Sequence, residues 1–185
     1  RVVLVAGPVA LATPSGVTRL DVGTAREMER AVREHAPAAD LVVMAAAVAD
    51  FRPRRVAAGK IKKKEGLPPA DIELEENPDI LGGLRALAPR AVLVGFAAET
   101  GDLDRHARDK LERKGADFLV ANDVSRRDIA FESEDNEVTV FRRGGEPVFF
   151  SRRPKPELAA SLFDLFTATL SDRVDRETSP AAGPR

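Results

Sequence analysis

The chain has 185 residues, of which 43% are hydrophobic and 32% charged, a balance typical of a globular protein that buries a core. Its 29 basic and 30 acidic residues leave a net charge of −1 at pH 7, so no overall field favours nucleic acid or an anionic membrane. It has no cysteine, which excludes disulfides, thiolate nucleophiles and cysteine-ligated zinc. The sequence shows no apolar run of membrane-spanning length and no signal peptide, so we expect a cytoplasmic protein.

Four short apolar runs predict buried β-strands, with helical patterns between them. Each run is continuously apolar rather than alternating, as expected for a parallel sheet that is covered on both faces. The predicted strands are Val2–Ala6, Leu41–Ala46, Ala91–Phe96 and Asp117–Ala121. The alternation of strands and helices predicts an α/β fold: a Rossmann-like open, mostly parallel sheet with helices on both faces.

Three helices are predicted between these strands. The first begins with a capping box, in which Thr24 and Glu27 are spaced to bond each other's backbone N–H groups. The second covers Pro78 to about Leu87. In the third, apolar residues recur every four positions from Leu103, and Gly115 is a plausible end.

The C-terminal third changes character. Two short strands, Glu137–Phe141 and Val148–Ser151, flank a Gly-Gly turn and predict a β-hairpin. A final helix is expected at about 156–170, followed by a disordered tail at 172–185, so that the folded domain covers 1–171. Two stretches rich in proline and glycine, 7–22 and 51–69, are predicted to be loops, and loops of that length are usually functional or disordered.

Three of the predicted strands are followed by small residues and then a polar one, and these segments are called strand exits below. The strand exits are Ala45–Asp50, Gly95–Thr100 and Ala121–Ser125. Ligands of open parallel sheets bind beyond the carboxyl ends of the strands, where small residues let a ligand approach the backbone. Close packing of strand against helix explains any one exit equally well, but the three together favour a shared ligand site.

Two further segments have both a structural and a functional interpretation. Asn77 can cap a helix whose first position is Pro78, which is the structural interpretation. The functional interpretation is that this helix start binds an anion, although Asp79 would repel a phosphate unless a cation lies between them. The lysine cluster Lys60–Lys64 is either a solvated face or a mobile strap that closes over a polyphosphate. A nucleic-acid patch is a third interpretation, which one run without aromatic residues or net positive charge supports only weakly.

Lys110 and Lys114 lie one helical turn apart and form a basic stripe with His106. From spacing alone, a solvated face is favoured over contacts with a polyphosphate. Neither His35 nor His106 is assigned a catalytic role.

Seven motifs occur in an order that resembles one known family. They are Ala6–Val9, Thr24–Met28, Ala46–Phe51, Lys60–Lys63, Asn77–Ile80, Gly95–Thr100 and Ala121–Ser125. Over about 1–170 the chain resembles phosphopantothenoylcysteine synthetase, the synthetase half of the bacterial bifunctional phosphopantothenoylcysteine decarboxylase/synthetase flavoprotein. Each motif alone is weak, whereas all of them in register are highly specific.

The resemblance implies a ligase of coenzyme A biosynthesis that joins 4′-phosphopantothenate to cysteine. It implies CTP and a divalent cation, usually Mg²⁺, with an acyl-cytidylate intermediate. It also implies that the domain forms a homodimer. A decarboxylase domain, which uses FMN, is expected on the same polypeptide.

The resemblance also implies roles for individual residues. Lys60 is expected to be the catalytic group that neutralises charge. The residues expected to contact the nucleotide are Met44, Ala45, Ala46, Asp50, Lys60, Pro78, Asp79, Ile80, Leu81, Phe96, Lys110 and Lys114. Ala47, Asn122 and Asp123 are expected on the substrate side, and Asp50 and Asp79 are candidate metal ligands.

The family's domain begins with a further strand and a glycine-rich segment carrying an arginine and an asparagine, and nothing in this sequence matches them. We therefore expect an N-terminally incomplete domain. A non-catalytic nucleotide-binding or assembly module on the same fold is the main alternative. A dinucleotide oxidoreductase lacks support, because no Gly-x-Gly-x-x-Gly follows the first strand.

Overall fold

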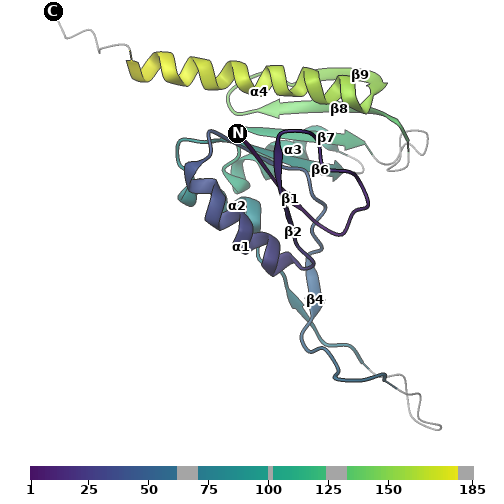
Figure 1. Cartoon of the computed structure of the whole chain (residues 1–185). Coiled ribbons are helices and arrows are strands. Elements are labelled where there is room, and N and C mark those ends of the chain that lie inside the picture. The colour runs from purple at the N-terminus through teal and green to yellow at the C-terminus, as the bar shows by residue number, and fades with distance from the viewer. Residues whose placement is uncertain (62–70, 100–101, 124–132, 179–185) are drawn as a thin grey trace, which may run out of the picture. The chain divides into compact units, whose positions relative to one another are not determined.

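The computed structural model describes residues 1–61, 71–99, 102–123 and 133–178, with only the backbone described for Glu99, Asp123 and 172–178 (Figure 1). The chain forms two compact units. Unit 1 comprises Arg1–Val32 and Ala47–Asp79, and unit 2 comprises Arg33–Ala46 and Ile80–Arg185.

Unit 2 is built on a five-stranded sheet of order β3-β6-β7-β8-β9. Its strands are β3 (Leu41–Met44), β6 (Val92–Glu99), β7 (Phe118–Asp123), β8 (Asp135–Arg142) and β9 (Val148–Pro154). The first three run parallel, and β8 and β9 are antiparallel additions at one side. The three strands predicted in this region and the C-terminal hairpin are confirmed, with ends displaced by a few residues. Burial is confirmed for β6 and β7 but not for β3, whose Val43 is 42% exposed.

Helices cover both faces of this sheet, as predicted. On one face, α4 (Lys155–Thr178) packs along the strands (Figure 1). The core on that side consists of alternate residues of three strands together with one stripe of the helix: Val92, Val94, Phe118, Val120, Val138, Val140, Leu158, Leu162 and Phe166. The other face meets α2 (Ile80–Leu87) and α3 (Leu103–Lys114).

The helix signals of the sequence are confirmed in two helices. At α1 (Ala25–His35), the Glu27 N–H donates to Thr24 Oγ1 at 3.2 Å and the Thr24 N–H donates to Glu27 Oε2 at 3.0 Å, so the capping box forms. Helix α3 ends at Gly115, which adopts the left-handed conformation with φ 62°. A 3₁₀ turn, η1 (Ala36–Ala38), follows α1.

Helix α4 is longer than the sequence indicates. It ends at Thr178 rather than near Leu170, so 172–178, predicted to be part of a disordered tail, are helical. Residues 179–185 lie outside the described part of the chain, and the domain boundary after 171 stays a prediction.

Unit 1 begins with two parallel strands, β1 (Val2–Ala6) and β2 (Val17–Asp21). The prediction that 7–22 is entirely loop is therefore wrong over β2. The connection is held by Arg19, whose guanidinium donates to the carbonyls of Leu11 at 2.6 Å and Val9 at 3.3 Å. Strand β1 was expected to be buried in the main sheet; instead it pairs with β2, and Val2 is 54% exposed.

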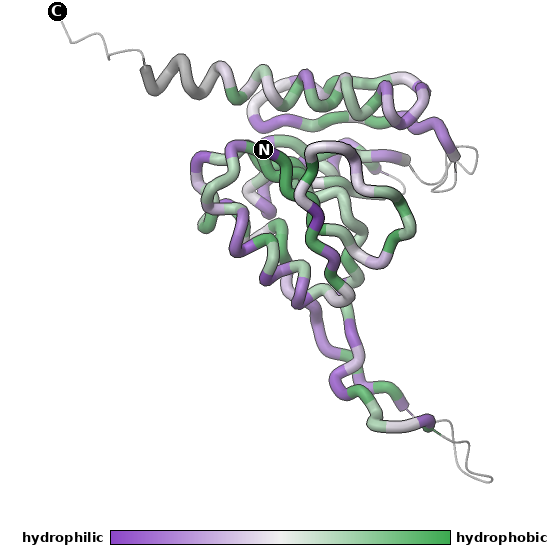
Figure 2. The backbone as a smooth tube through the Cα atoms, viewed as in Figure 1, coloured by the Kyte–Doolittle hydropathy of each residue, from purple (hydrophilic) through white to green (hydrophobic). Residues whose placement is uncertain are grey.

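A short antiparallel ribbon, consisting of β4 (Phe51–Pro53) and β5 (Leu74–Glu76), completes unit 1 and is called the ribbon below. The loop predicted at 51–69 is thus wrong over β4. Phe51 and Leu74 on one face of the ribbon are 55% and 58% exposed. Figure 2 shows hydrophilic and hydrophobic residues mixed along it.

Candidate functional site

The carboxyl ends of the three parallel strands lie side by side, as the strand exits predicted. Met44, the last residue of β3, is in register with Gly95 of β6. Further along β6, Ala98 is in register with Asn122 of β7. Beyond β3, Ala45 and Ala46 are exposed, and Asn122 is half-buried. Unit 2 therefore presents one edge of small residues with an amide, an arrangement that admits a ligand close to the backbone.

Gly95 lets α2 approach this edge closely. A Cβ on Gly95 would lie 2.6 Å from Leu81 Cδ2 and 3.1 Å from Leu119 Cδ1. Leu81, half-buried in the first turn of α2, thus packs over β6 where a side chain would otherwise stand. Phe96 is partly buried and packs against the core on the α4 side. Contact of Leu81 or Phe96 with a nucleotide stays a prediction.

The start of α2 differs from its prediction. The helix begins at Ile80, so Pro78 is not its first helical residue. Asn77 does not cap it: the side-chain Nδ2 donates to the Ala49 carbonyl at 2.8 Å, and Oδ1 accepts from Arg52 at 3.0 Å. Exposed Asp79 directly precedes the helix. Because Ile80 is buried, any contact it makes with a ligand would come from its backbone N–H.

The remaining predicted site residues fall on both units. Ala47, Asp50 and Lys60 belong to unit 1 and are exposed. Lys62, Lys63 and Lys64 of the predicted strap lie outside the described residues. Lys110 and Lys114 are half-buried on α3 in unit 2. Of Asp123 only the backbone is described, in register with Glu99. The roles assigned to these residues stay predictions.

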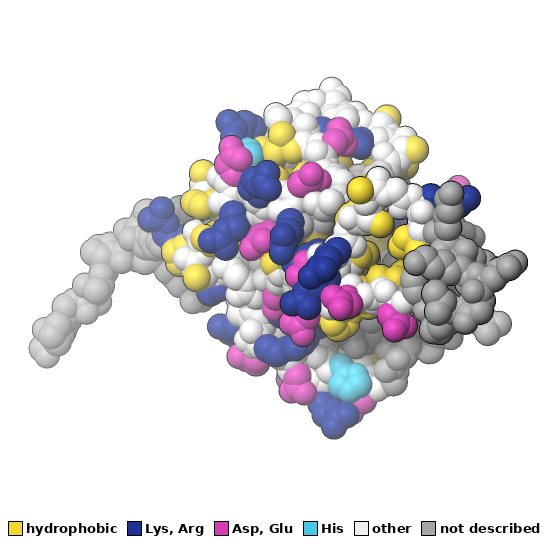
Figure 3. Space-filling model, turned by 90° about the horizontal axis from the view of Figure 1, so that it is seen from below, with side chains coloured by type: hydrophobic (Ala, Val, Ile, Leu, Met, Phe, Trp, Pro, Cys, Tyr) yellow, Lys and Arg dark blue, Asp and Glu magenta, His cyan; other side chains and the backbone are white. Residues whose placement is uncertain are grey.

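Charge gives no separate sign of a ligand on the face of the described residues that Figure 3 draws. There, lysine and arginine side chains are interspersed with aspartate and glutamate rather than gathered into one basic field. Among the described residues, no group of three or more His, Asp or Glu is placed to hold a metal ion. Asp50 and Asp79 are exposed carboxylates on separate segments, so the described protein groups alone do not form a cage for Mg²⁺.

The sequence interpretation missed Arg52 and gave Asn77 the wrong partner. Arg52 donates to the Asn77 side chain and to the Glu76 carbonyl, and its Nη2 lies 2.9 Å from Glu75 Oε1. No local signal could have found this contact, because Arg52 and the acidic pair Glu75-Glu76 are brought together only by the pairing of β4 with β5, which are separated by more than a dozen residues. None of the helices in the described part of the chain is long and apolar enough to cross a membrane.

Comparison with known proteins supports the resemblance seen in the sequence. The Coenzyme A biosynthesis bifunctional protein CoaBC of Vibrio cholerae is 47% identical over 146 residues, which cover 78% of this chain and 37% of that protein. The protein of the same name from Mycolicibacterium smegmatis is 43% identical over 183 residues, covering 93% of this chain and 44% of the relative. The chain thus spans less than half the length of these curated relatives.

Solved structures agree on the fold. A crystal structure of the C-terminal domain of Coenzyme A biosynthesis bifunctional protein CoaBC matches with a TM-score of 0.75 at 35% identity, covering 92% of this chain and 74% of that one. A Cab2 mutant in complex with phosphopantothenate-cysteine matches with a TM-score of 0.66 at 21% identity, covering 88% of this chain and 56% of that one, and it supports the fold alone. The family model described as DNA/pantothenate metabolism flavoprotein C-terminal domain matches residues 1–170, and the chain belongs to this family.

Proposed function

We propose that the chain is the synthetase domain of a coenzyme A biosynthesis enzyme and ligates 4′-phosphopantothenate to cysteine at the expense of CTP. The observation that carries the proposal is its identity of 43–47% with curated proteins named for coenzyme A biosynthesis, over most of its length. The edge at the carboxyl ends of β3, β6 and β7 is where we propose that the nucleotide binds, because ligands of open parallel sheets lie beyond that end of the strands.

The proposed chemistry has two steps, because a carboxylate is a poor electrophile. A carboxylate oxygen of 4′-phosphopantothenate attacks the α-phosphorus of CTP, pyrophosphate leaves, and an acyl-cytidylate forms. The amine of cysteine then attacks the acyl carbon, loses a proton, and CMP leaves as the amide bond forms. The protein's task is to orient the reactants and to neutralise the charge that develops on the phosphates.

Lys60 is the group proposed to neutralise that charge. It is exposed on the segment that follows β4, where an ammonium group is free to follow a bound triphosphate. The backbone N–H groups at the start of α2, together with Lys110 and Lys114, are proposed as further phosphate contacts. We propose that Mg²⁺ enters as the complex of CTP, with Asp50 and Asp79 as its candidate protein ligands.

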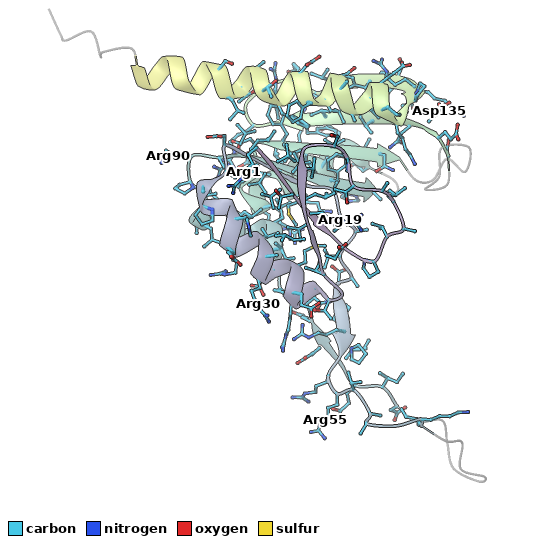
Figure 4. The ribbon with its side chains drawn as sticks, in the orientation of Figure 1. Arg1, Arg19, Arg30, Arg55, Arg90 and Asp135 are labelled. Atoms are coloured by element: carbon cyan, nitrogen blue, oxygen red, sulfur yellow. The ribbon has the colours of Figure 1, made fainter. Side chains whose placement is uncertain are left out.

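The assay is release of pyrophosphate from CTP by the chain, with and without 4′-phosphopantothenate and cysteine. We expect turnover only when the organic substrates are present, and less with ATP. Lys60→Ala is expected to lower kcat by about 100-fold, because it removes a charge that acts on the transition state. Arg55→Ala is the matched control, since Arg55 is another exposed cation on the same segment (Figure 4).

Two outcomes contradict the proposal. An equal loss in both variants would mean that only the overall positive charge of the segment matters. Calorimetric binding of CTP without any turnover would favour the alternative, a non-catalytic nucleotide-binding or assembly module on the same fold.

The proposed assembly follows from the relatives. Because they are named bifunctional and are more than twice as long as this chain, we propose that a decarboxylase domain using FMN accompanies it on one polypeptide. That the synthetase domain is a homodimer is a separate proposal, which rests on the family resemblance of the sequence alone. We further propose a cytoplasmic location, in keeping with small soluble substrates.

A further inference from the structure

One arginine links the two strands of the ribbon to the residue that follows them. Arg52 Nη1 donates to Asn77 Oδ1 at 3.0 Å and to the Glu76 carbonyl. Its Nη2 lies 2.9 Å from Glu75 Oε1, and the arginine side chain is only 22% exposed. A guanidinium is suited to this position because its planar fork presents several donors at once, which an ammonium group does not.

Asn77 extends the connection to the two residues that precede β4. Its Nδ2 donates to the Ala49 carbonyl at 2.8 Å, and its backbone N–H donates to the Asp50 carbonyl at 2.8 Å. The side chain therefore uses its donor and its acceptor at the same time. A carboxylate of the same size would retain the bond from Arg52 but would set an oxygen against the Ala49 carbonyl.

These bonds hold residues that core packing leaves largely unsupported. Ala47, Ala49, Asp50 and Asp79 are all exposed. Polar bonds rather than burial therefore tie the backbone of 49–50 to Asn77, the residue directly before Pro78, within unit 1. Segments held in this way bind a ligand without the loss of conformational freedom that an unordered loop would suffer.

We propose that Arg52 and Asn77 form a positioning clamp that fixes Asp50 relative to Pro78 and Asp79 for binding of the nucleotide. The inference rests on the proposed function, in which Asp50 and Asp79 hold the Mg²⁺ of the CTP complex, and on the contact of Pro78 with the nucleotide that the family resemblance implies. The clamp itself touches no substrate: Arg52 and Asn77 act through the backbone on either side of them.

The principal test is steady-state kinetics of the chain with Asn77→Asp, Arg52→Lys and Arg52→Ala. Loss of positioning weakens binding in the ground and transition states alike, so KM for CTP is expected to rise about tenfold or more while kcat changes little. Arg52→Lys should retain part of the affinity lost in Arg52→Ala, because it keeps the charge but not the fork.

Arg54→Ala is the matched control, since it removes an ion pair of the same ribbon. Arg54 Nη1 lies 3.7 Å from Glu73 Oε2, and the Arg54 side chain is 61% exposed. It should leave KM within about twofold of the wild-type value, as expected for an exposed pair. Equal KM values in Asn77→Asp, Arg52→Ala and Arg54→Ala, at similar melting temperatures, would overturn the clamp.

Amide hydrogen exchange tests the clamp without reference to activity. The Asn77 N–H, which bonds the Asp50 carbonyl, should exchange about tenfold faster in Arg52→Ala than in Arg54→Ala. Unchanged exchange would refute the clamp. If neither the wild-type chain nor a longer polypeptide that adds the family's N-terminal strand and glycine-rich segment makes product, the proposed function fails. Hydrogen exchange alone then decides whether the clamp exists.

Discussion

The five-stranded sheet of unit 2 and the ribbon of unit 1 are held together by different forces. In the sheet, Val92, Leu93 and Leu119 are fully buried. In the ribbon, the apolar side chains of Phe51 and Leu74 are more than half exposed, and its contacts are hydrogen bonds and ion pairs. Burial of apolar area dominates stability, whereas exposed polar contacts contribute little to it. Substitutions in the sheet should therefore mainly affect folding, and substitutions in the ribbon should mainly affect binding.

The largest expected difference in stability is between two leucine truncations, one in the sheet and one in the ribbon. Leu119→Ala removes a side chain that is 0% exposed, so we expect a loss of about 2–5 kcal/mol in the free energy of unfolding. Leu74→Ala removes one that is 58% exposed and should cost less than about 0.5 kcal/mol. Urea denaturation of both variants measures the difference. Similar losses would break the comparison, because they would show that the ribbon buries Leu74 in solution.

A smaller effect is expected at the strand exit, where Gly95 meets α2. Gly95→Ala should cost about 1–3 kcal/mol, because the new Cβ would force Leu81 to move from a position 2.6 Å away. Gly83→Ala is the control on α2 itself: nothing lies within 4 Å of the new Cβ, and alanine favours the helix by up to about 1 kcal/mol. Thermal unfolding should move in opposite directions for the two variants. A neutral Gly95→Ala would mean that α2 is not held tightly against β6.

The smallest effect is expected at the exposed capping box of α1. The Gly23 N–H, followed by the Thr24 side chain, holds the pKa of Glu27 below its ordinary value by hydrogen bonding. A lowered pKa in the folded state means that the stabilisation is present above the pKa of the unfolded chain and is lost as pH falls through the folded pKa. Glu27→Gln should therefore lower the melting temperature slightly at neutral pH and not at all in strong acid. If the melting temperatures of Glu27→Gln and the wild type still differed in strong acid, the effect would come from the shape of the side chain rather than from its charge.

Much of unit 2 was predictable, because its signals are local or strongly periodic. The apolar runs of β6 and β7 and the four-residue period ending at Gly115 determine elements that burial then stabilises. The small and polar residues that follow three of the predicted strands also indicated which edge of the sheet could bind a ligand. The hydrogen-bonded register of β3, β6 and β7 confirmed that their ends lie together.

Unit 1 was predicted poorly, because its strands are short and its partners are distant in sequence. Strand β2 is five residues long and β4 only three, and neither shows a run of apolar residues. The pairing of Phe51–Pro53 with Leu74–Glu76 closes a long connection that no local pattern reveals. Asn77 has an ordinary capping sequence, yet the carbonyl of Ala49 and the guanidinium of Arg52 offered its side chain better-placed partners than the N–H groups of α2.

The sequence by itself determined the α/β class, the capping of α1 and α3, and the order of motifs that identified the family. These properties depend on periodicity and on bonds between residues three or four apart, which any chain with this sequence forms locally. Only the tertiary structure decided that β1 pairs with β2, that Gly95 makes room for Leu81, and that Arg52 and Asn77 join the two sides of the ribbon. Such contacts depend on which distant groups the fold brings within bonding distance, and no local pattern encodes that choice.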